Sequence, residues 1–177
     1  MPDYDLHEKA VSIVVDAGGE LVGRTRLQKI AYLIQLVGFS DDFPFEYHHF
    51  GPYSEELSDA VRIATGLKLI SEVERQSTRG GWYSVFRANN GRPSIGGKRS
   101  QFITVAAKIG AIELELAATA AYLYSSEGIG KDGAGDPWAE TAHRKPEKAG
   151  DGRLEKAKSA YRELMKVETP IPLPAII

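Results

Sequence analysis

Apolar residues recur at helical spacing in the first forty positions of the chain. In residues 6–17 they fall every three or four positions, and two glycines follow, which predicts a helix that ends there. A second apolar stripe begins after Thr25 and ends at Gly38, which predicts a second helix. Because Gln28 stands three residues after Thr25, we interpret this pair as a capping box at the start of the second helix.

An aromatic-rich linker separates the second helix from a third. Proline and a Gly-Pro pair in residues 40–53 favour extended or turn backbone there. Ser54 is expected to be the N-cap of the third helix, which Gly66 closes. Two extended runs, residues 66–75 and 82–88, then flank a turn with two glycines, which predicts a β-hairpin.

The second half of the chain is predicted to be helical. One apolar stripe from Val105 to Leu123 would cover about five turns of a single helix. Asp136 followed by proline is a favourable helix start, and Asp151 is expected to cap the last helix. The tail has three prolines in five residues and is expected to be extended or disordered.

The order helix, helix, helix, hairpin is typical of a winged helix. We therefore expect a mostly α fold with a small β-hairpin, in which a winged-helix-like part and C-terminal helices pack as one domain. The expected parts are residues 1–100, residues 101–168 and an extended tail at 169–177.

Composition restricts the class of protein. With 177 residues, 42% of them apolar and 26% charged, the chain suits one globular domain. The absence of cysteine excludes disulfides, thiolate zinc sites and a cysteine nucleophile. The first ten residues do not have the pattern of a signal peptide, and the most apolar stretch carries charges that argue against a membrane span. A cytoplasmic protein without membrane contact is the expectation.

Histidines are the residues most suited to catalysis or metal binding. His48 and His49 are adjacent, so in an extended chain they point to opposite sides and are not expected to share a zinc ion. His143 near a helix end could act as a base, but no nucleophile is identifiable beside it. No phosphate-binding loop or nucleophile motif is present either. We therefore expect no catalytic residue, no metal site and no cofactor.

The charge pattern gives opposite indications about nucleic acid. The start of the third helix, residues 54–63, holds three acids and one base, which disfavours phosphate contact. Residues 75–99 hold six bases and no acid, which favours it, although charge can equally protect a hairpin edge. Nucleic-acid binding is therefore the alternative function, and its expected residues are Arg79, Trp82, Arg87, Arg92, Lys98 and Arg99.

The aromatic linker favours a protein partner instead, because aromatic residues dominate binding hot spots. The expected partner-binding residues are Phe45, Tyr47, His49, Tyr53, Glu55 and Glu56. The same aromatics could cap the core. The stripe 105–123 could pack on the winged helix or on a twin helix in a homodimer. The apolar tail could add to a partner's groove or sheet edge, or fray.

Two segments, residues 23–38 and 45–70, resemble the SocA-like Panacea domain proteins and the related YwgA-like bacterial proteins. The matching residues are Leu27, Gln28, Lys29, Tyr32 and Gln35, then Phe50, Gly51, Pro52, Tyr53 and Ser54, then Gly66 and Ile70. The second half, with HRKP at 143–146 and the helical pattern at 154–164, also resembles the YwgA branch.

The resemblance implies a small, mostly helical domain without a known catalytic centre. In the Panacea branch it implies an antitoxin that neutralises a toxin, or an adaptor that delivers a toxin to a protease. We therefore expect a non-enzymatic interaction module of a bacterial toxin-antitoxin or phage-defence locus, with a toxin or protease as its protein partner.

Overall fold

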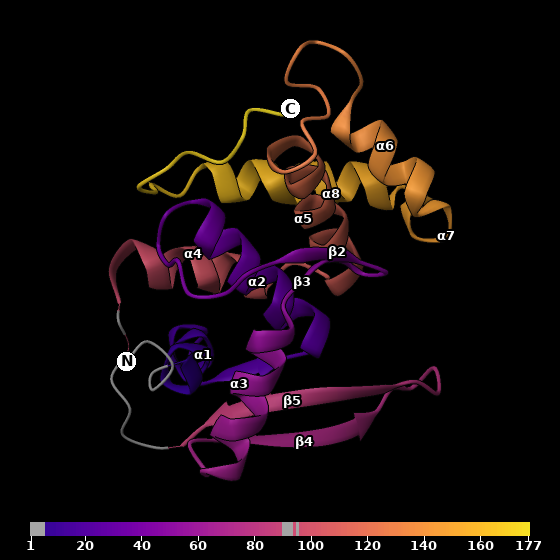
Figure 1. The fold of residues 1–177 in the computed structure, drawn as a ribbon. Helices are drawn as coiled ribbons and strands as arrows, with labels where there is room; N and C mark the ends of the chain where they lie inside the picture. Colours follow the sequence, from indigo (N-terminus) through magenta and orange to yellow (C-terminus); the bar gives the residue numbers. More distant parts are fainter. Residues whose placement is uncertain (1–5, 90–93, 95) are drawn as a thin grey trace.

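The computed structural model describes residues 6–89, 94 and 96–177, and in these ranges the fold is mostly helical with small antiparallel sheets (Figure 1). The N-terminal half consists of α1 (Leu6–Asp16), β1 (Glu20–Val22), α2 (Arg24–Leu36), β2 (Glu46–His48), β3 (Gly51–Tyr53), α3 (Glu55–Gly66), β4 (Ile70–Gln76) and β5 (Trp82–Ala88). The C-terminal half consists of α4 (Gly97–Ala107), α5 (Ala111–Ser125), α6 (Pro137–Arg144), α7 (Pro146–Ala149) and α8 (Arg153–Met165). The predicted mostly α fold with a β-hairpin is confirmed.

Three strands form an antiparallel sheet in the order β1-β5-β4. Residues directly opposite each other in such a sheet share a face, so the register shows which side chains lie on the same face of the sheet. The face that carries Phe86 and Ile70 is buried at the end near the helices, whereas the tip of the β4–β5 hairpin extends past them (Figure 1). A second hairpin, β2–β3, lies against α2 and α5.

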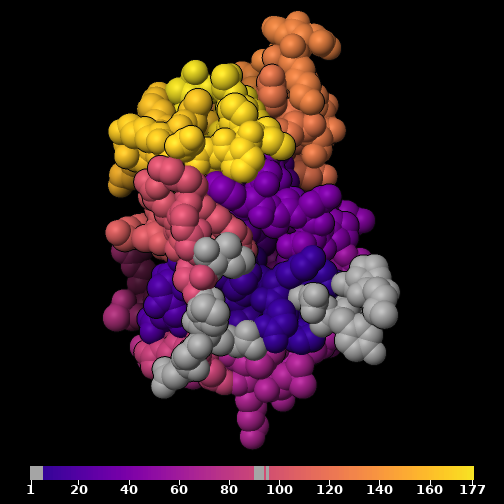
Figure 2. All heavy atoms as spheres, turned by 90° about the vertical axis from the view of Figure 1, so that its left-hand side faces the viewer, coloured from indigo at the N-terminus to yellow at the C-terminus, as the bar shows by residue number. Residues whose placement is uncertain are grey.

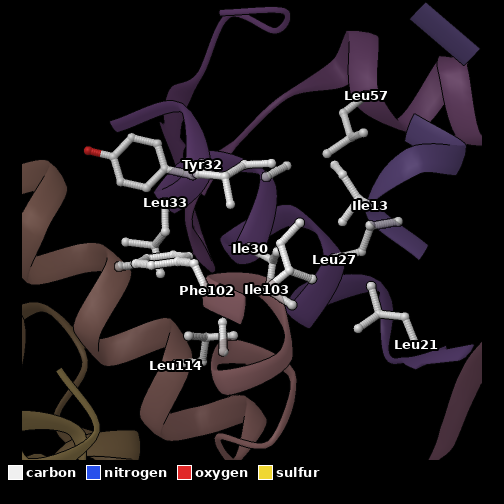
Figure 3. Packing of buried hydrophobic residues seen from close by; sticks show 14 of the residues in the cluster. Ile13, Leu21, Leu27, Ile30, Tyr32, Leu33, Leu57, Phe102, Ile103 and Leu114 are labelled. Atoms are coloured by element: carbon white, nitrogen blue, oxygen red, sulfur yellow. The ribbon is translucent and has the colours of Figure 1, made fainter. Parts of the chain in front are cut away.

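One apolar core joins the two halves. Figure 3 shows Leu33 of α2 beside Phe102 of α4, and Ile13 of α1 near Leu27 of α2, and all are buried. Helix α5 lies at the centre, in contact with α2, α6 and α8. Its side chains from Leu114 to Ala121 are all buried. Other parts of the molecule therefore cover this stretch of the helix on every side.

The predicted continuous helix over the stripe 105–123 is wrong. Helix α4 ends at Ala107 and α5 begins at Ala111, because Gly110 adopts the extended backbone of an N-cap. Other helices of the same chain bury Leu116, Ala120 and Leu123 of the stripe, whereas Val105, Ile109 and Ile112 are partly exposed.

Two of the predicted helix caps are confirmed and two are wrong. Ser54 accepts a hydrogen bond from the Leu57 amide, and Asp136 accepts one from the Trp138 amide. Helix α2 has no side-chain cap, because Gly23 precedes it and the Gln28 side chain bonds elsewhere. Asp151 has φ 57 and lies one residue before the N-cap position of α8, which is a glycine.

The tail has neither helix nor strand and packs against the rest of the molecule (Figure 2, yellow). The Ile171 amide donates to the Val37 carbonyl at 2.9 Å. Tyr161 donates to the Pro174 carbonyl at 2.6 Å, and Trp138 Nε1 donates to the Ile176 carbonyl at 2.9 Å. Across the described ranges, no helix combines the length and the apolar character that crossing a membrane requires.

Candidate functional site

Polar side chains of α2 hold the aromatic linker in place. Gln35 accepts from the Asp42 and Phe43 amides and donates to the Phe43 carbonyl at 2.6 Å. Gln28 accepts from the Ser54 amide at 2.8 Å and donates to the Ser54 carbonyl at 2.9 Å. These bonds satisfy backbone groups that a non-regular segment would otherwise bury unpaired.

A buried charged cluster fixes the β2–β3 turn. Lys145 and Lys148 both donate to the Glu115 carboxylate, at 2.9 and 2.8 Å, and Lys145 also donates to the His49 carbonyl at 2.7 Å. Lys29 of α2 donates to the Pro52 carbonyl at 2.7 Å. Burial lowers the pKa of Lys29 to about 7; Glu115 opposes that shift, and Lys145 and Lys148 reinforce it.

Gly51 brings the turn into close contact with α5. Its φ is +87°, and a Cβ there would lie 2.5 Å from Thr119 Oγ1. Thr119 Oγ1 is buried with no hydrogen-bond partner among the described residues, and it faces this glycine. The Gly-Pro-Tyr-Ser segment is therefore held by hydrogen bonds from α2 and packs closely on α5.

The expected partner-binding residues divide into packed and exposed ones. Phe45 packs edge-on against Tyr32, and Tyr47 lies between Tyr122 and the Arg144 guanidinium, which is 5.1 Å from its ring centroid. Tyr53 is half-buried, and its hydroxyl lies 2.7 Å from Ser58 Oγ. The exposed members of the set are His49, Glu55 and Glu56.

A groove of about 680 Å³ lies between α2, α3 and the β4–β5 hairpin. We call it the α3–hairpin groove. Its floor is apolar, and the floor residues are Leu27, Leu57, Val61 and Phe86. Its charged rim residues are Arg24, Glu55, Asp59, Arg62 and Glu72. Sequence reasoning did not find the groove, because its walls come from segments that only the tertiary fold brings together.

Ion pairs order part of this rim. Arg24 Nε donates to Glu72 Oε1 at 2.6 Å and its other end lies 3.8 Å from Glu74. This hydrogen bond to the Glu72 carboxylate raises the pKa of Arg24. Arg62 pairs with Asp59 at 2.7 Å on α3. Each base of the rim is therefore matched by at least one neighbouring carboxylate.

Large apolar side chains are exposed beside the groove. On α3, Ile63 and Leu67 are 50% and 56% exposed. On the hairpin, Trp82 is 68% exposed, and it lies opposite Gln76 on the sheet face that carries Phe86. These three side chains do not line the groove themselves; they are exposed on the two elements that wall it.

The basic residues expected to contact nucleic acid do not form one surface. Arg99 is buried and pairs with Asp16 of α1. Arg87 pairs with Glu20 at 2.8 Å, and Lys98 lies 3.7 Å from Glu168. Arg79 is exposed in the turn of the hairpin, at its far end from α4, and Arg92 lies outside the described residues.

The candidate histidines have different surroundings in the structure. His143 is exposed on α6, and His48 Nε2 lies 3.7 Å from Glu46 while its ring stacks on Tyr53. In the part of the chain that the structure describes, no three metal-ligating side chains cluster.

A distant relative of the chain is found among known proteins. No known family profile matches the chain. Over 77 residues the chain is 32% identical to a protein of Bacillus subtilis (strain 168) named "Uncharacterized protein YwgA". That match covers 44% of this chain and 45% of the relative, so the chain spans less than half of the length of this curated relative. The match supports the resemblance to YwgA-like proteins and does not extend it to the Panacea domain.

Proposed function

We propose that this protein is a non-enzymatic interaction module that binds a partner protein through α3 and the β4–β5 hairpin. The observation that carries the proposal is the exposure of Ile63 and Leu67 on α3 and of Trp82 on the hairpin, the two elements that wall the α3–hairpin groove. Burial of exposed apolar side chains is the main favourable contribution to protein association, and tryptophan is enriched in hot spots.

The finer proposal is an antitoxin or adaptor that neutralises or delivers its partner. Its support is the resemblance of the Leu-Gln-Lys and Gly-Pro-Tyr-Ser segments to Panacea and YwgA-like proteins. In the structure the two segments are bonded to each other. Lys29 donates to the Pro52 carbonyl and Gln28 accepts from the Ser54 amide, so the first segment holds the second, which leads into α3. In this proposal Gln28 and Lys29 position the binding helix, and Leu27 and Tyr53 of the same segments line the groove.

The second candidate is a winged-helix nucleic-acid binder. The order α1, β1, α2, α3, β4, β5 supports it, because α3 then occupies the place of a recognition helix. The charge of α3 argues against it, since Glu55, Glu56 and Asp59 would face phosphates. We therefore rank it second.

Affinity capture from the native host, with and without nuclease, tests the two candidates. We expect one protein to be captured stoichiometrically in both conditions and to be lost with Trp82→Ala and Ile63→Lys. Met165→Ala, which alters an exposed residue of α8, is the control and should retain the partner. Recovery dominated by nuclease-sensitive nucleic acid, with steep salt dependence, would overturn the proposal in favour of the second candidate.

A further inference from the structure

The two faces of the β4–β5 hairpin carry opposite charges. Glu72 lies opposite Phe86 and Glu74 lies opposite Ser84, so both acids share the face that lines the α3–hairpin groove. Arg75 and Arg87 occupy the other face, because the side chains of a strand alternate. The bases that the sequence shows in this region are thus directed away from the groove.

The groove rim has an excess of acid. The acids that line it are Glu55 and Asp59 of α3 and Glu72 of the hairpin, whereas the bases of the rim are Arg24 and Arg62. Arg24 is already held by two glutamates and Arg62 by Asp59. Glu55 makes no ion pair with the described residues, so its charge remains uncompensated.

Lys29 does not reverse this balance. Although it contributes to the groove lining, it is 1% exposed and donates to the Pro52 carbonyl inside the fold. The field that an incoming ligand meets at the rim is therefore negative, above a floor of leucine, valine and phenylalanine.

Resting on the proposed function, we propose that the groove binds a basic, amphipathic segment of the partner protein. Apolar side chains of that segment occupy the floor beside Leu57 and Phe86. Its lysine or arginine side chains pair with Glu55 on α3 and Glu74 on the hairpin. Trp82 is exposed further along the same hairpin face and provides an aromatic surface for a further cation or apolar group.

The test uses the full chain and two synthetic peptides of equal length with alternating leucine and charged positions, one with lysine and one with glutamate. Calorimetry is expected to show binding of the lysine peptide and none of the glutamate peptide. A scrambled lysine peptide, which has the same charge but no apolar face, should bind at least about tenfold more weakly, because the floor is left unfilled.

Charge reversal locates the binding. Glu74→Lys on the hairpin and Glu55→Lys on α3 are each expected to weaken binding of the lysine peptide about three- to tenfold. Glu163→Lys on α8 makes the same change in net charge far from the groove and should leave binding unchanged. Thermal unfolding of each variant verifies the fold, and either groove variant alone suffices if the other is unstable.

Equal binding of both peptides, no binding of either, or equal weakening by Glu163→Lys would overturn the basic-segment proposal. The broader function has a separate readout, because capture of the native partner depends on Trp82 and not on the sign of the peptide. A partner lost with Trp82→Ala yet retained by both Glu74→Lys and Glu55→Lys would leave the interaction module in place and remove only the basic segment.

Discussion

Gln28 illustrates how one buried side chain substitutes for regular secondary structure. It lies 5% exposed on α2 and bonds both the amide and the carbonyl of Ser54. A strand partner would offer the same donor and acceptor pair. The interaction fixes the N-terminus of α3, whose N-cap is Ser54 itself.

Gln28→Leu is therefore expected to lower the free energy of unfolding by about 1–3 kcal/mol, because the buried Ser54 amide loses its partner. Thr25→Ala is the matched control. If Thr25 capped α2, this substitution would lower the free energy of unfolding by about 1 kcal/mol. Because α2 has no side-chain cap, we expect a change of less than about 0.5 kcal/mol. Urea denaturation measures both, and equal costs for the two variants would contradict the assignment.

Gly51 is required by two separate constraints. Alanine there must adopt a positive φ, at about 1–2 kcal/mol, and must also displace Thr119 Oγ1, at a further cost of about 1–3 kcal/mol. Gly80→Ala, with φ +92° and open space around its Cβ, isolates the backbone cost. We expect Gly51→Ala to destabilise the protein more than Gly80→Ala in thermal unfolding. Similar losses would show that the contact with α5 is unimportant.

Lys29 makes the free energy of unfolding depend on pH. Its folded pKa of about 7 lies below the ordinary lysine value of 10.5, so between these values the unfolded chain binds more protons and stability rises with pH. The slope from this group is at most about 1.4 kcal/mol per pH unit. Lys29→Met should remove this rise. Urea titrations from pH 6 to 10 test it, and parallel curves for both proteins would refute it.

Residue chemistry was partly predictable from the sequence. The resemblance singled out Gln28, Lys29 and Gly51, yet local rules assigned Gln28 to a capping box with Thr25. The side chain instead bonds Ser54, which is remote in sequence, because the tertiary fold offers it a buried backbone pair. Helix-capping rules consider only neighbouring residues, so they do not include a hydrogen-bond partner that is remote in sequence.

At the scale of elements, the ion pair of Arg99 with Asp16 joins α4 to α1. Arg99 also donates to Ser12 Oγ at 3.0 Å, so the guanidinium binds two positions of α1. The pair therefore fixes the start of α4 against α1. Its burial makes it structural, although the sequence grouped Arg99 with surface bases.

Arg99→Met is expected to lower the free energy of unfolding by about 3–5 kcal/mol, since it leaves the buried Asp16 carboxylate without its charged partner. Lys98→Met, at the neighbouring exposed position, should change it by less than about 0.5 kcal/mol. Chemical denaturation of the pair measures the difference. A small effect of Arg99→Met would mean that solvent reaches Asp16 and that Arg99 is available to ligands.

Long helices and the β4–β5 hairpin were predictable because their periodicity extends over many residues. The strands β1, β2 and β3 have three residues each, too few for alternation to be read. The division between α4 and α5 was also missed, since the apolar spacing of the stripe continues across Gly110 while the backbone does not.

For the whole molecule, the sequence predicts the fold class but not the candidate site. The α3–hairpin groove exists because β5 pairs with both β1 and β4 and thereby places Phe86 opposite Leu57 and Val61. The segregation of acids to the groove face follows from that register. Read along the chain, Arg75–Arg87 looks uniformly basic; in space the same hairpin is acidic on one face.

The docking of the tail also sets an order of events during synthesis. Residues 171–176 supply bonds to Val37, Trp138 and Tyr161, so the C-terminal half cannot complete its packing until these residues have left the ribosome. The N-terminal half, including α3 and its hairpin, is made first. A nascent chain would therefore present the proposed binding surface before its own core is closed.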